Sequence, residues 1–340
     1  MCTGISIVSQ EGHPYWGRTQ DFEQEFEYAG MKIPAGTTIE STYTPITTRY
    51  AVMGIAWAQD VHQHPVILDG INEHGICGGS FYFDHFYRYV DRATIDESGK
   101  KALRGEELVT WILTQYGSLD EIKERLNSEL GIVNEPGPMM GMSVPQHAVF
   151  QDDTGRSIVV EPSQENGFRI FENPVGVFAN APTFDWHLHN LKTHLERSTC
   201  RTYTYSVEEP IERIGLEETC SGLIDIPSDY KPESRFLRAA YVKLMSLKVH
   251  DAHAVNEVFQ LLTTVNTPKG ALRIRSGGEI LVPWTQYTVV YDIQSKTLYA
   301  ATYDNRNVRL LEFGDSTQWE GIRYYEFISE QTYEPFEEIR

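Results

Sequence analysis

Strand pairs joined by short turns recur along this chain and restrict its fold more than any other feature. Residues 2–9 and 14–20 flank the turn-forming segment Glu11-Gly12-His13-Pro14 and predict a β-hairpin. A second tight hairpin is predicted around Asp152-Asp153-Thr154-Gly155. The complete set of predicted strands is 2–9, 14–20, 50–57, 65–71, 75–83, 147–152, 156–161, 168–171, 174–179, 285–293, 297–303, 308–313 and 323–328. Because hairpins join antiparallel neighbours, this order favours antiparallel sheets.

Helical patterns interrupt the strands in two places. Between Gly105 and Leu130 apolar residues recur at helical spacing, and Gly117-Ser118 divides the region into two helices. Ser118 and Glu121 have the spacing of a capping box for the second helix. Further helices are predicted at 184–196, from Ser234 onward and at 251–264. The order of elements therefore predicts an α+β fold, with helical layers on antiparallel sheets in a single domain over residues 1–340.

Composition limits the partners of the chain. A formal charge of -19 over 340 residues argues against a nucleic-acid partner, because phosphate binding needs clustered Lys and Arg. No apolar run approaches the roughly 20 residues of a membrane span, and the first residues lack the pattern of a signal peptide. We therefore expect a cytoplasmic protein with no membrane partner. The polar, irregular segment 199–232 is typical of a functional or assembly excursion.

The sequence carries no metal or cofactor signature. Its cysteines lack the spacing of a zinc site, and His62 and His64 have no evident third ligand. Phosphate- and dinucleotide-binding glycine motifs are also missing. Cys77 is predicted to lie buried in a strand, whereas Cys200 and Cys220 could pair in an oxidising compartment. Catalysis would then rest on side chains alone.

The start of the chain offers a candidate nucleophile. Removal of Met1 would leave Cys2 with a thiol and a free α-amine on one residue, and such an amine titrates at about pH 8. The alternative is that Cys2 is a small apolar residue that opens a strand. Arg18 and Asp21 follow at the end of the return strand, close to residue 2. They form either a catalytic constellation beside the thiol or an ordinary surface ion pair.

Asn180 is a further candidate site residue, as a hydrogen-bond donor. It ends the strand 174–179, and Pro182 disfavours helix for the residue before it. A side-chain amide at such an exit can donate a hydrogen bond to a developing oxyanion, although turn formation is its commoner use.

Eight segments in order resemble one family. They are Met1-Cys2-Thr3, Gly17-Arg18-Thr19-Gln20-Asp21-Phe22, Asp69-Gly70-Ile71-Asn72-Glu73-His74-Gly75, Ile158-Val159-Val160-Glu161-Pro162, Val177-Phe178-Ala179-Asn180-Ala181-Pro182, Ser234-Arg235-Phe236-Leu237-Arg238-Ala239, Val265-Asn266-Thr267-Pro268-Lys269-Gly270 and Tyr303-Asp304-Asn305. Over nearly its whole length the chain resembles the choloylglycine hydrolases, which include conjugated bile-salt hydrolases and penicillin V acylases.

The resemblance implies a four-layer αββα sandwich, the N-terminal-nucleophile hydrolase fold, and hydrolysis of a linear amide without a cofactor. It also implies a homotetramer in which the excursion 199–232 is an assembly arm. Carried over by position, Cys2 is the nucleophile, and its α-amine accepts and returns the proton. Asp21 would orient that amine, Arg18 would favour the thiolate, Asn180 would supply an oxyanion donor, and Arg235 would support the charge network.

The residue at position 82, Tyr82, helps to indicate which substrate the chain acts on. Bile-salt hydrolases typically carry Asn at this position, whereas penicillin V acylases of Gram-positive type resemble this chain in carrying Tyr. Asp185-Trp186-His187 also resembles the acylases. We therefore expect an enzyme of penicillin V acylase type. The alternatives are a hydrolase of glycine- or taurine-conjugated bile salts, an acylase of N-acyl homoserine lactones, and a binding relative that kept only the fold.

Overall fold

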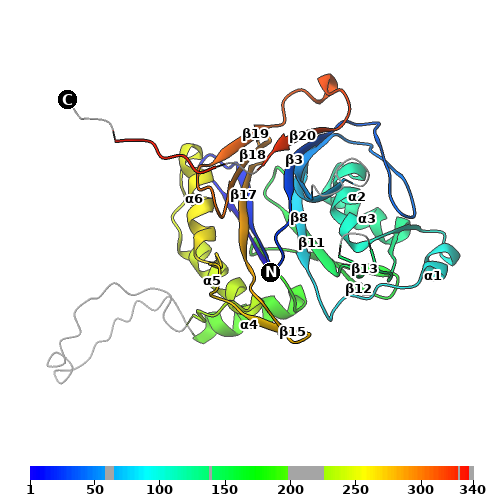
Figure 1. The fold of residues 1–340 in the computed structure, drawn as a ribbon, viewed down its shortest axis with the longest axis horizontal. Coiled ribbons are helices and arrows are strands. Elements are labelled where there is room, and N and C mark those ends of the chain that lie inside the picture. The colour runs from blue at the N-terminus through cyan, green and yellow to red at the C-terminus, as the bar shows by residue number, and fades with distance from the viewer. Residues whose placement is uncertain (58–64, 138–139, 198–225, 328–329, 337–340) are drawn as a thin grey trace.

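Two antiparallel sheets face each other between layers of helices in the computed structural model, which describes residues 1–57, 65–137, 140–197, 226–327 and 330–336. Helices α5 and α6 cover one sheet, and α2 and α3 cover the other (Figure 1). This is the αββα arrangement, so the predicted fold class is confirmed.

The six-stranded sheet holds the beginning of the chain. Its spatial order is β14 (Val177–Ala179), β1 (Cys2–Val8), β2 (Pro14–Phe22), β17 (Trp284–Asp292), β18 (Thr297–Thr302) and β19 (Arg309–Glu312). The predicted hairpin of β1 and β2 is present, with Cys2 opposite Gln20 and Gly4 opposite Arg18. A strand from the middle of the sequence, β14, and one from its last third, β17, therefore flank β1 and β2.

The eight-stranded sheet is built mostly from the first half of the chain. Its spatial order is β13 (Gly167–Glu172), β12 (Ser157–Gln164), β11 (Gln146–Gln151), β8 (Cys77–Tyr82), β7 (Val66–Asn72), β6 (Val52–Trp57), β3 (Tyr28–Ile33) and β20 (Arg323–Glu326). The predicted hairpin of β11 with β12 is present, and β7 and β8, both predicted as strands, form another hairpin.

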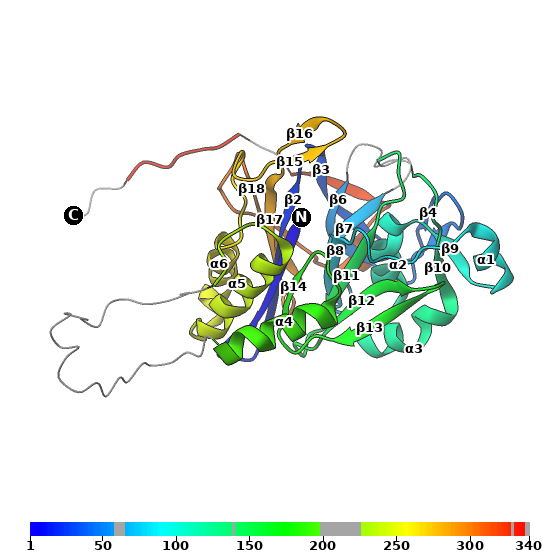
Figure 2. The ribbon, with the colours of Figure 1, turned by 90° about the horizontal axis from the view of Figure 1, so that it is seen from below.

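The helices follow the predicted periodic regions. They are α2 (Leu108–Gln115), α3 (Leu119–Glu129), α4 (Phe184–Arg197), α5 (Pro232–Met245) and α6 (Asp251–Thr263). Ser118 caps α3 as predicted, because its side chain accepts a hydrogen bond from the backbone N–H of Glu121. Helix α5 starts two residues before the predicted Ser234, which places Arg235 in its first turn. Figure 2 shows α4, α5 and α6 on the side of β14 and β1.

Several short elements escaped prediction. They are α1 (Arg92–Glu97), β4 (Thr38–Ile39) with β5 (Ile46–Thr47), β9 (Lys101–Leu103) with β10 (Leu130–Ile132), β15 (Ile274–Ser276) with β16 (Glu279–Leu281), and the 3-10 turns η1 (Gly105–Glu107) and η3 (Ser316–Gln318). Strands of two or three residues are too short to show a periodicity. The long strand β3 was also missed.

The predicted end of strand 14–20 was wrong. Strand β2 continues to Phe22 instead of ending at residue 20, because β17 pairs with its far end and places Thr285 opposite Asp21. The last two predicted strands are present in different sheets: β19 pairs with β18, whereas β20 pairs with β3. The partners of β2 and β20 here are distant in sequence, so local patterns cannot identify them.

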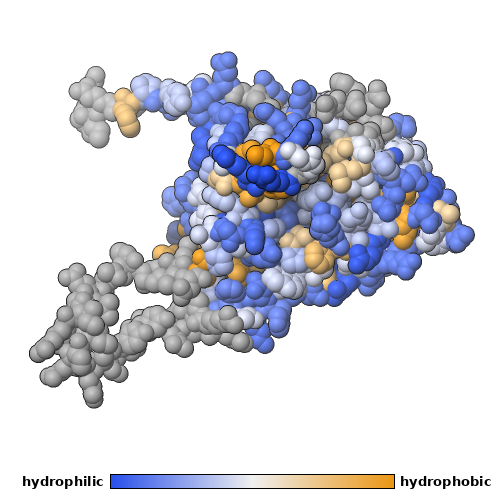
Figure 3. All heavy atoms as spheres, turned by 60° about the horizontal axis from the view of Figure 1, so that its bottom comes forward, coloured by the Kyte–Doolittle hydropathy of each residue, from blue (hydrophilic) through white to orange (hydrophobic). Residues whose placement is uncertain are grey.

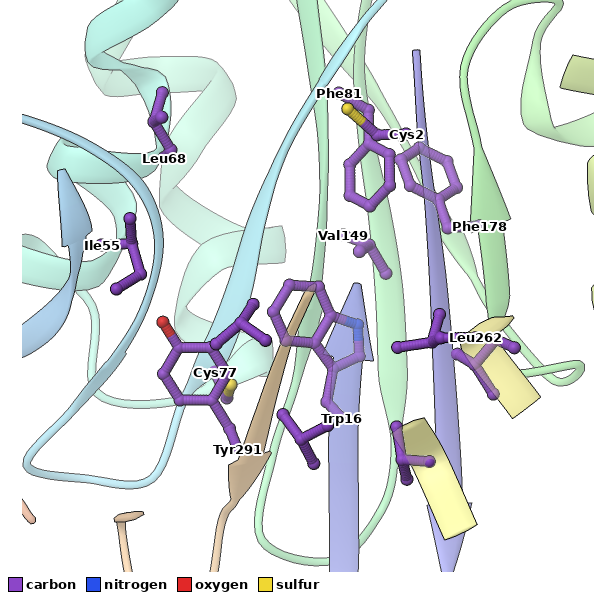
Figure 4. Packing of buried hydrophobic residues seen from close by; sticks show 14 of the residues in the cluster. Cys2, Trp16, Ile55, Leu68, Cys77, Phe81, Val149, Phe178, Leu262 and Tyr291 are labelled. Carbon is purple, nitrogen blue, oxygen red and sulfur yellow. The ribbon is translucent and has the colours of Figure 1, made fainter. Parts of the chain in front are cut away.

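The space between the sheets is packed with apolar side chains. Figure 4 shows Trp16 and Tyr291 of one sheet against Cys77 and Val149 of the other. The face drawn in Figure 3 is largely hydrophilic, with small hydrophobic patches, as the acidic composition suggests. Among the described helices none is long and apolar enough to cross a membrane.

Candidate active site

Cys2 opens β1, and its side chain turns into the space between the two sheets. It is 3% exposed, and Figure 4 shows it beside Phe81 and Phe178 at one end of the packed core. Its Sγ lies 3.4 Å from the amide oxygen Oε1 of Gln20, the residue opposite it on β2. The thiol is therefore held at the edge of the core rather than exposed to water.

Arg18 lies on the same face of β2 as Gln20 and is fully buried. Its guanidinium donates to Oε1 of Gln20 and to the carbonyl of Leu68, and its Nη1 lies 3.6 Å from Oδ2 of Asp69. Burial alone lowers the pKa of Arg18, but its electrostatic interactions with Cys2, Tyr287 and Asp69 raise it above its ordinary value. Arg18 is thus a permanent cation that reaches Cys2 through a shared contact with Gln20.

Gln20 belongs to this site although the sequence reasoning did not select it. Its oxygen accepts from both Arg18 and the thiol of Cys2. Strand alternation supplied a usable signal, because residues two apart point to the same face. The polar side chain two residues after Arg18 could therefore be expected to lie beside the Arg18 side chain.

Asp21 occupies the opposite face of β2. Its Oδ1 accepts a 2.6 Å hydrogen bond from the hydroxyl of Thr285, and its Oδ2 lies 3.9 Å from Nη1 of Arg235. Thr19 also donates to Oδ2, at 3.4 Å. Both Asp21 and Arg235 are fully buried, so this ion pair is not a surface pair.

Arg235 connects the start of the chain to Asn180. Its Nη1 donates to the carbonyl oxygen of Cys2 at 2.6 Å and to the hydroxyl of Thr3, and its Nη2 donates to Oδ1 of Asn180 at 2.9 Å. Burial lowers the pKa of Arg235, and the charges of Asp21 and Cys2 oppose that effect. One guanidinium therefore contacts three of the other predicted site residues.

Asn180 directly follows β14, at the strand exit that the sequence predicts. Its Oδ1 accepts from the backbone N–H of Cys2 as well as from Arg235, and its Nδ2 donates to the carbonyl oxygen of Tyr82 at 3.0 Å. Nε2 of His187 lies 2.8 Å from the backbone oxygen of Asn180. These contacts orient the amide with its nitrogen toward Tyr82.

Tyr82 ends β8 and forms a wall beside the N-terminus. Its ring packs edge-on against Phe22, with 6.3 Å between the centroids. Burial, together with the charges of Asp84 and Glu23, raises the pKa of Tyr82 to about 12. The phenol is therefore protonated at neutral pH and presents an O–H donor.

Two hollows meet at Tyr82. A cavity of about 40 Å³ lies beside Cys2, and its walls include Phe22, Phe26, Phe81, Tyr82, Met140 and Val144. A more open cleft of about 310 Å³ is lined by Met1, Tyr82, Asp84, His85, Phe86, Asn180, Ala181, Pro182, Pro232 and Glu233. Small apolar groups can thus be accommodated on the thiol side, and Met1 lies in the neighbouring cleft.

Met1 occupies the position next to the thiol. Its terminal ammonium donates to the backbone oxygen of Asp21, and the backbone N–H of Asp21 donates to Met1 O at 2.7 Å. While Met1 is present, the nitrogen of Cys2 is a peptide amide and not an amine. A peptide nitrogen cannot accept a proton from the thiol.

The remaining candidates have little part in the site. Cys77 is buried in β8, as predicted, and burial raises the pKa of its thiol well above the ordinary value. His62, His64, Cys200 and Cys220 lie outside the described residues. Among the described residues no group of His, Cys, Asp or Glu is arranged to hold a metal ion.

The facing antiparallel sheets between helical layers define the N-terminal-nucleophile hydrolase fold, with Cys2 at the head of a central strand. Residues 2–318 match the family described as "Linear amide C-N hydrolases, choloylglycine hydrolase family". The chain belongs to this family, and it is a hydrolase that acts on linear amides.

Relatives support the assignment along the whole chain. The bile salt hydrolase/transferase of Clostridium perfringens is 30% identical over 318 residues, which are 92% of either chain. The bile salt hydrolase/transferase of Lactiplantibacillus plantarum is 31% identical over 317 residues, 91% of either chain. In solved structures, the C2A variant of the Clostridium perfringens conjugated bile acid hydrolase matches with a TM-score of 0.82 at 26% identity, covering 99% of this chain and 100% of that one.

A penicillin V acylase shares the fold at greater distance. The structure of the Agrobacterium tumefaciens enzyme matches with a TM-score of 0.74 at 17% identity, covering 97% of this chain and 95% of that chain. At this identity the likeness concerns the fold alone.

Proposed function

We propose that the chain hydrolyses its amide substrate with Cys2 as nucleophile, after Met1 has been removed. The observation that carries this proposal is the position of Cys2, with a cavity and Arg18 on its thiol side and Asn180 and Arg235 on its backbone side. Removal of Met1 converts the nitrogen of Cys2 into an amine that can take the proton of the thiol.

The reaction would proceed in two stages. The Cys2 sulfur attacks the amide carbon, the amine returns its proton to the leaving nitrogen, and water then hydrolyses the thioester. Arg18 favours the thiolate as a fixed positive charge. The side-chain nitrogen of Asn180 supplies a donor for the oxyanion of each tetrahedral intermediate, and Asp21 with Arg235 keeps the amine in place.

The acyl group is the part of the substrate that the cavity selects. Aromatic rings enclose the small space beside Cys2, so a compact aromatic acyl group such as the phenoxyacetyl of penicillin V suits it. Conjugated bile salts are the second candidate, because relatives at 30 and 31% identity are bile salt hydrolases. Penicillin V and glycocholate therefore belong in one assay.

Two measurements test the proposal. Intact mass should show that the active protein lacks Met1, and Cys2→Ala should remove turnover of every substrate without unfolding the chain. Cys2→Ser should retain slow turnover, because a hydroxyl is a weaker nucleophile at neutral pH. Turnover by Cys2→Ala within tenfold of the parent would exclude Cys2 as nucleophile. A clear preference for glycocholate would exclude the penicillin V type.

A homotetramer also belongs to the proposal, because the resemblance to the choloylglycine hydrolases implies it. Of the excursion at 199–232, residues 199–225 lie outside the described part of the chain, and α5 already begins at residue 232. Light scattering tests the assembly directly, and a stable monomer at assay concentration would contradict it.

A further inference from the structure

A buried carboxylate lies behind Arg18, on the side away from Cys2. Asp69 belongs to β7 in the eight-stranded sheet, whereas Arg18 belongs to β2 in the six-stranded sheet. Both side chains are fully buried, and Asp69 Oδ2 lies 3.6 Å from Nη1 of Arg18. The pair therefore links the two sheets within the core.

Two tyrosines hold Asp69 from the opposite sheet. The hydroxyl of Tyr287 donates to Oδ2 at 2.6 Å, and the hydroxyl of Tyr291 donates to Oδ1 at 2.7 Å. Both tyrosines lie on β17, which pairs with β2 beside Arg18. Each carboxylate oxygen thus has its own phenol donor, and neither oxygen is free to rotate away from Arg18.

The hydrogen-bond donors around Asp69 suit a carboxylate acceptor. Burial raises the pKa of Asp69 above its ordinary value, and Arg18, Tyr287 and Tyr291 oppose that effect only in part. Burial also raises the pKa of both tyrosines well above the ordinary value, so they remain donors. An ionised Asp69 offers an acceptor oxygen to each of these three neighbours at once.

The backbone leaves room for this arrangement. Gly79 lies opposite Asp69 on β8, and a Cβ at residue 79 would approach Cβ of Asp69 to 2.8 Å and the carbonyl oxygen of Leu68 to 2.9 Å. Leu68 O is itself an acceptor for Arg18 Nη1, at 3.4 Å. A side chain at position 79 would therefore displace the groups that fix the guanidinium.

We infer that Asp69 is a positioning residue, which Tyr287 and Tyr291 hold in place so that it fixes the guanidinium of Arg18 beside the thiol of Cys2. The connection runs from Asp69 to Arg18 and on to the oxygen that Gln20 shares with Cys2. This inference rests on the proposed role of Cys2 as nucleophile.

The reactivity of the Cys2 thiol should change in opposite directions if Asp69 positions Arg18 and if Asp69 acts on Cys2 by its charge alone. A negative charge that acted on Cys2 directly would disfavour the thiolate, so its removal would make the thiol more reactive. If Asp69 acts by holding Arg18, its removal loosens the cation and makes the thiol less reactive. The direction of the change therefore separates the two effects.

The experiment is alkylation of Cys2 by iodoacetamide between pH 6 and pH 9, with peptide mapping to assign the label. Asp69→Asn should slow alkylation at pH 7 about tenfold and move the pH profile upward, the size expected from one nearby cation. Tyr291→Phe, a milder change, should slow it about threefold by removing one donor. Unchanged or faster alkylation in both variants would overturn the inference.

Glu129→Gln is the matched control. Glu129 accepts from the hydroxyl of Tyr116 at 2.9 Å and from Arg125 Nε at 2.8 Å, on α3 and outside the site, so its substitution should leave alkylation unchanged. In an Arg18→Leu background, Asp69→Asn should slow alkylation no further, and independent effects of the two changes would overturn the inference. Alkylation needs no amide substrate, so a failure of the proposed hydrolysis would leave this test intact.

Discussion

Arg235 fixes the orientation of the Asn180 side chain. The guanidinium donates to Oδ1 at 2.9 Å, and the amide nitrogen consequently faces the carbonyl of Tyr82 at 3.0 Å. The same guanidinium holds the carbonyl of Cys2 at 2.6 Å. The proposed nucleophile and the proposed oxyanion donor are therefore aligned by one planar group that presents several N–H donors in fixed directions.

Replacement of Arg235 by Lys should reduce kcat about 100-fold, because one ammonium cannot reproduce both contacts and the Asn180 amide loses its fixed orientation. KM should change little. Arg238→Lys is the control on the same helix, because Arg238 bonds the carbonyls of Thr264 and Pro227 instead of the site. Steady-state kinetics of both variants test this prediction. Activity of Arg235→Lys within threefold of the parent would contradict the proposed role of Arg235 in orienting Asn180.

Tyr82 should set the ratio of the two candidate substrates. Tyr82→Asn removes the ring that packs on Phe22 and widens the cavity, so kcat/KM for glycocholate should rise relative to penicillin V by about tenfold, as one pocket group can discriminate. Tyr82→Phe retains the ring and should keep the original ratio. If both variants shift the ratio equally, the phenol and not the wall determines preference.

Local sequence patterns were sufficient to predict helical layers on antiparallel sheets and to select Cys2, Arg18, Asp21 and Asn180. Cys2, Arg18, Asp21, Asn180, Tyr82 and Arg235 lie in one contact network, although they span much of the chain. The hairpin of β1 and β2 and the end of β14 are local features, so their residues could be placed from turn and strand signals. The roles of Tyr82 and Arg235 came from the resemblance alone.

Contacts between distant segments could not be predicted in this way. Thr285 bonds Asp21, and Asp69 pairs with Arg18, only because β17 lies beside β2 and the two sheets stack. Nothing in the neighbouring sequence of either residue specifies that partner. The same limitation applies to β20, whose partner β3 comes from the other end of the sequence.

Gly78 should be indispensable for the stability of the eight-stranded sheet. A Cβ at this residue would lie 2.1 Å from the carbonyl oxygen of Val149 and 2.9 Å from Cα of Phe150, and neither backbone atom can move aside without breaking the β8–β11 pairing. Gly78→Ala should therefore lower the free energy of unfolding by about 3 kcal/mol.

Urea denaturation followed by tryptophan fluorescence measures that change. Gly117→Ala is the control, because the three atoms nearest to a Cβ there all belong to the side chain of Tyr50, with its hydroxyl at 3.0 Å, and that ring is half-buried and can adjust. The control should cost less than about 1 kcal/mol. If Gly78→Ala and Gly117→Ala lower the free energy of unfolding equally, the structure accommodates the added Cβ at residue 78 by small shifts of its neighbours.

Glu161 should make the chain less stable as the pH rises. It is fully buried in β12, its Oε1 accepts from the backbone N–H of Phe184 at 2.7 Å, and Nδ1 of His147 lies 3.5 Å away. Burial raises the pKa of Glu161 to about 8, partly opposed by the Phe184 N–H, whereas an unfolded glutamate titrates at about 4.3. The folded chain thus retains a proton that the unfolded chain releases.

This proton gives the sign of the pH dependence. The stabilisation is complete below the pKa of the unfolded glutamate and is lost as pH rises toward 8, at up to about 1.4 kcal/mol per pH unit. Burial lowers the pKa of His187 to about 4, so its own contribution changes mainly below pH 6.5. Between pH 6.5 and pH 8, Glu161 should therefore change the free energy of unfolding more than His187 does.

Glu161→Gln keeps an acceptor for Phe184 and removes the titration. Relative to the parent, the variant should gain about 2 kcal/mol of unfolding free energy between pH 6.5 and pH 8 in urea denaturation. Glu124→Gln, at an exposed carboxylate on α3, should leave the slope of the parent unchanged. If Glu161→Gln instead follows the parent across this range, Glu161 does not retain its proton in the folded chain at these pH values.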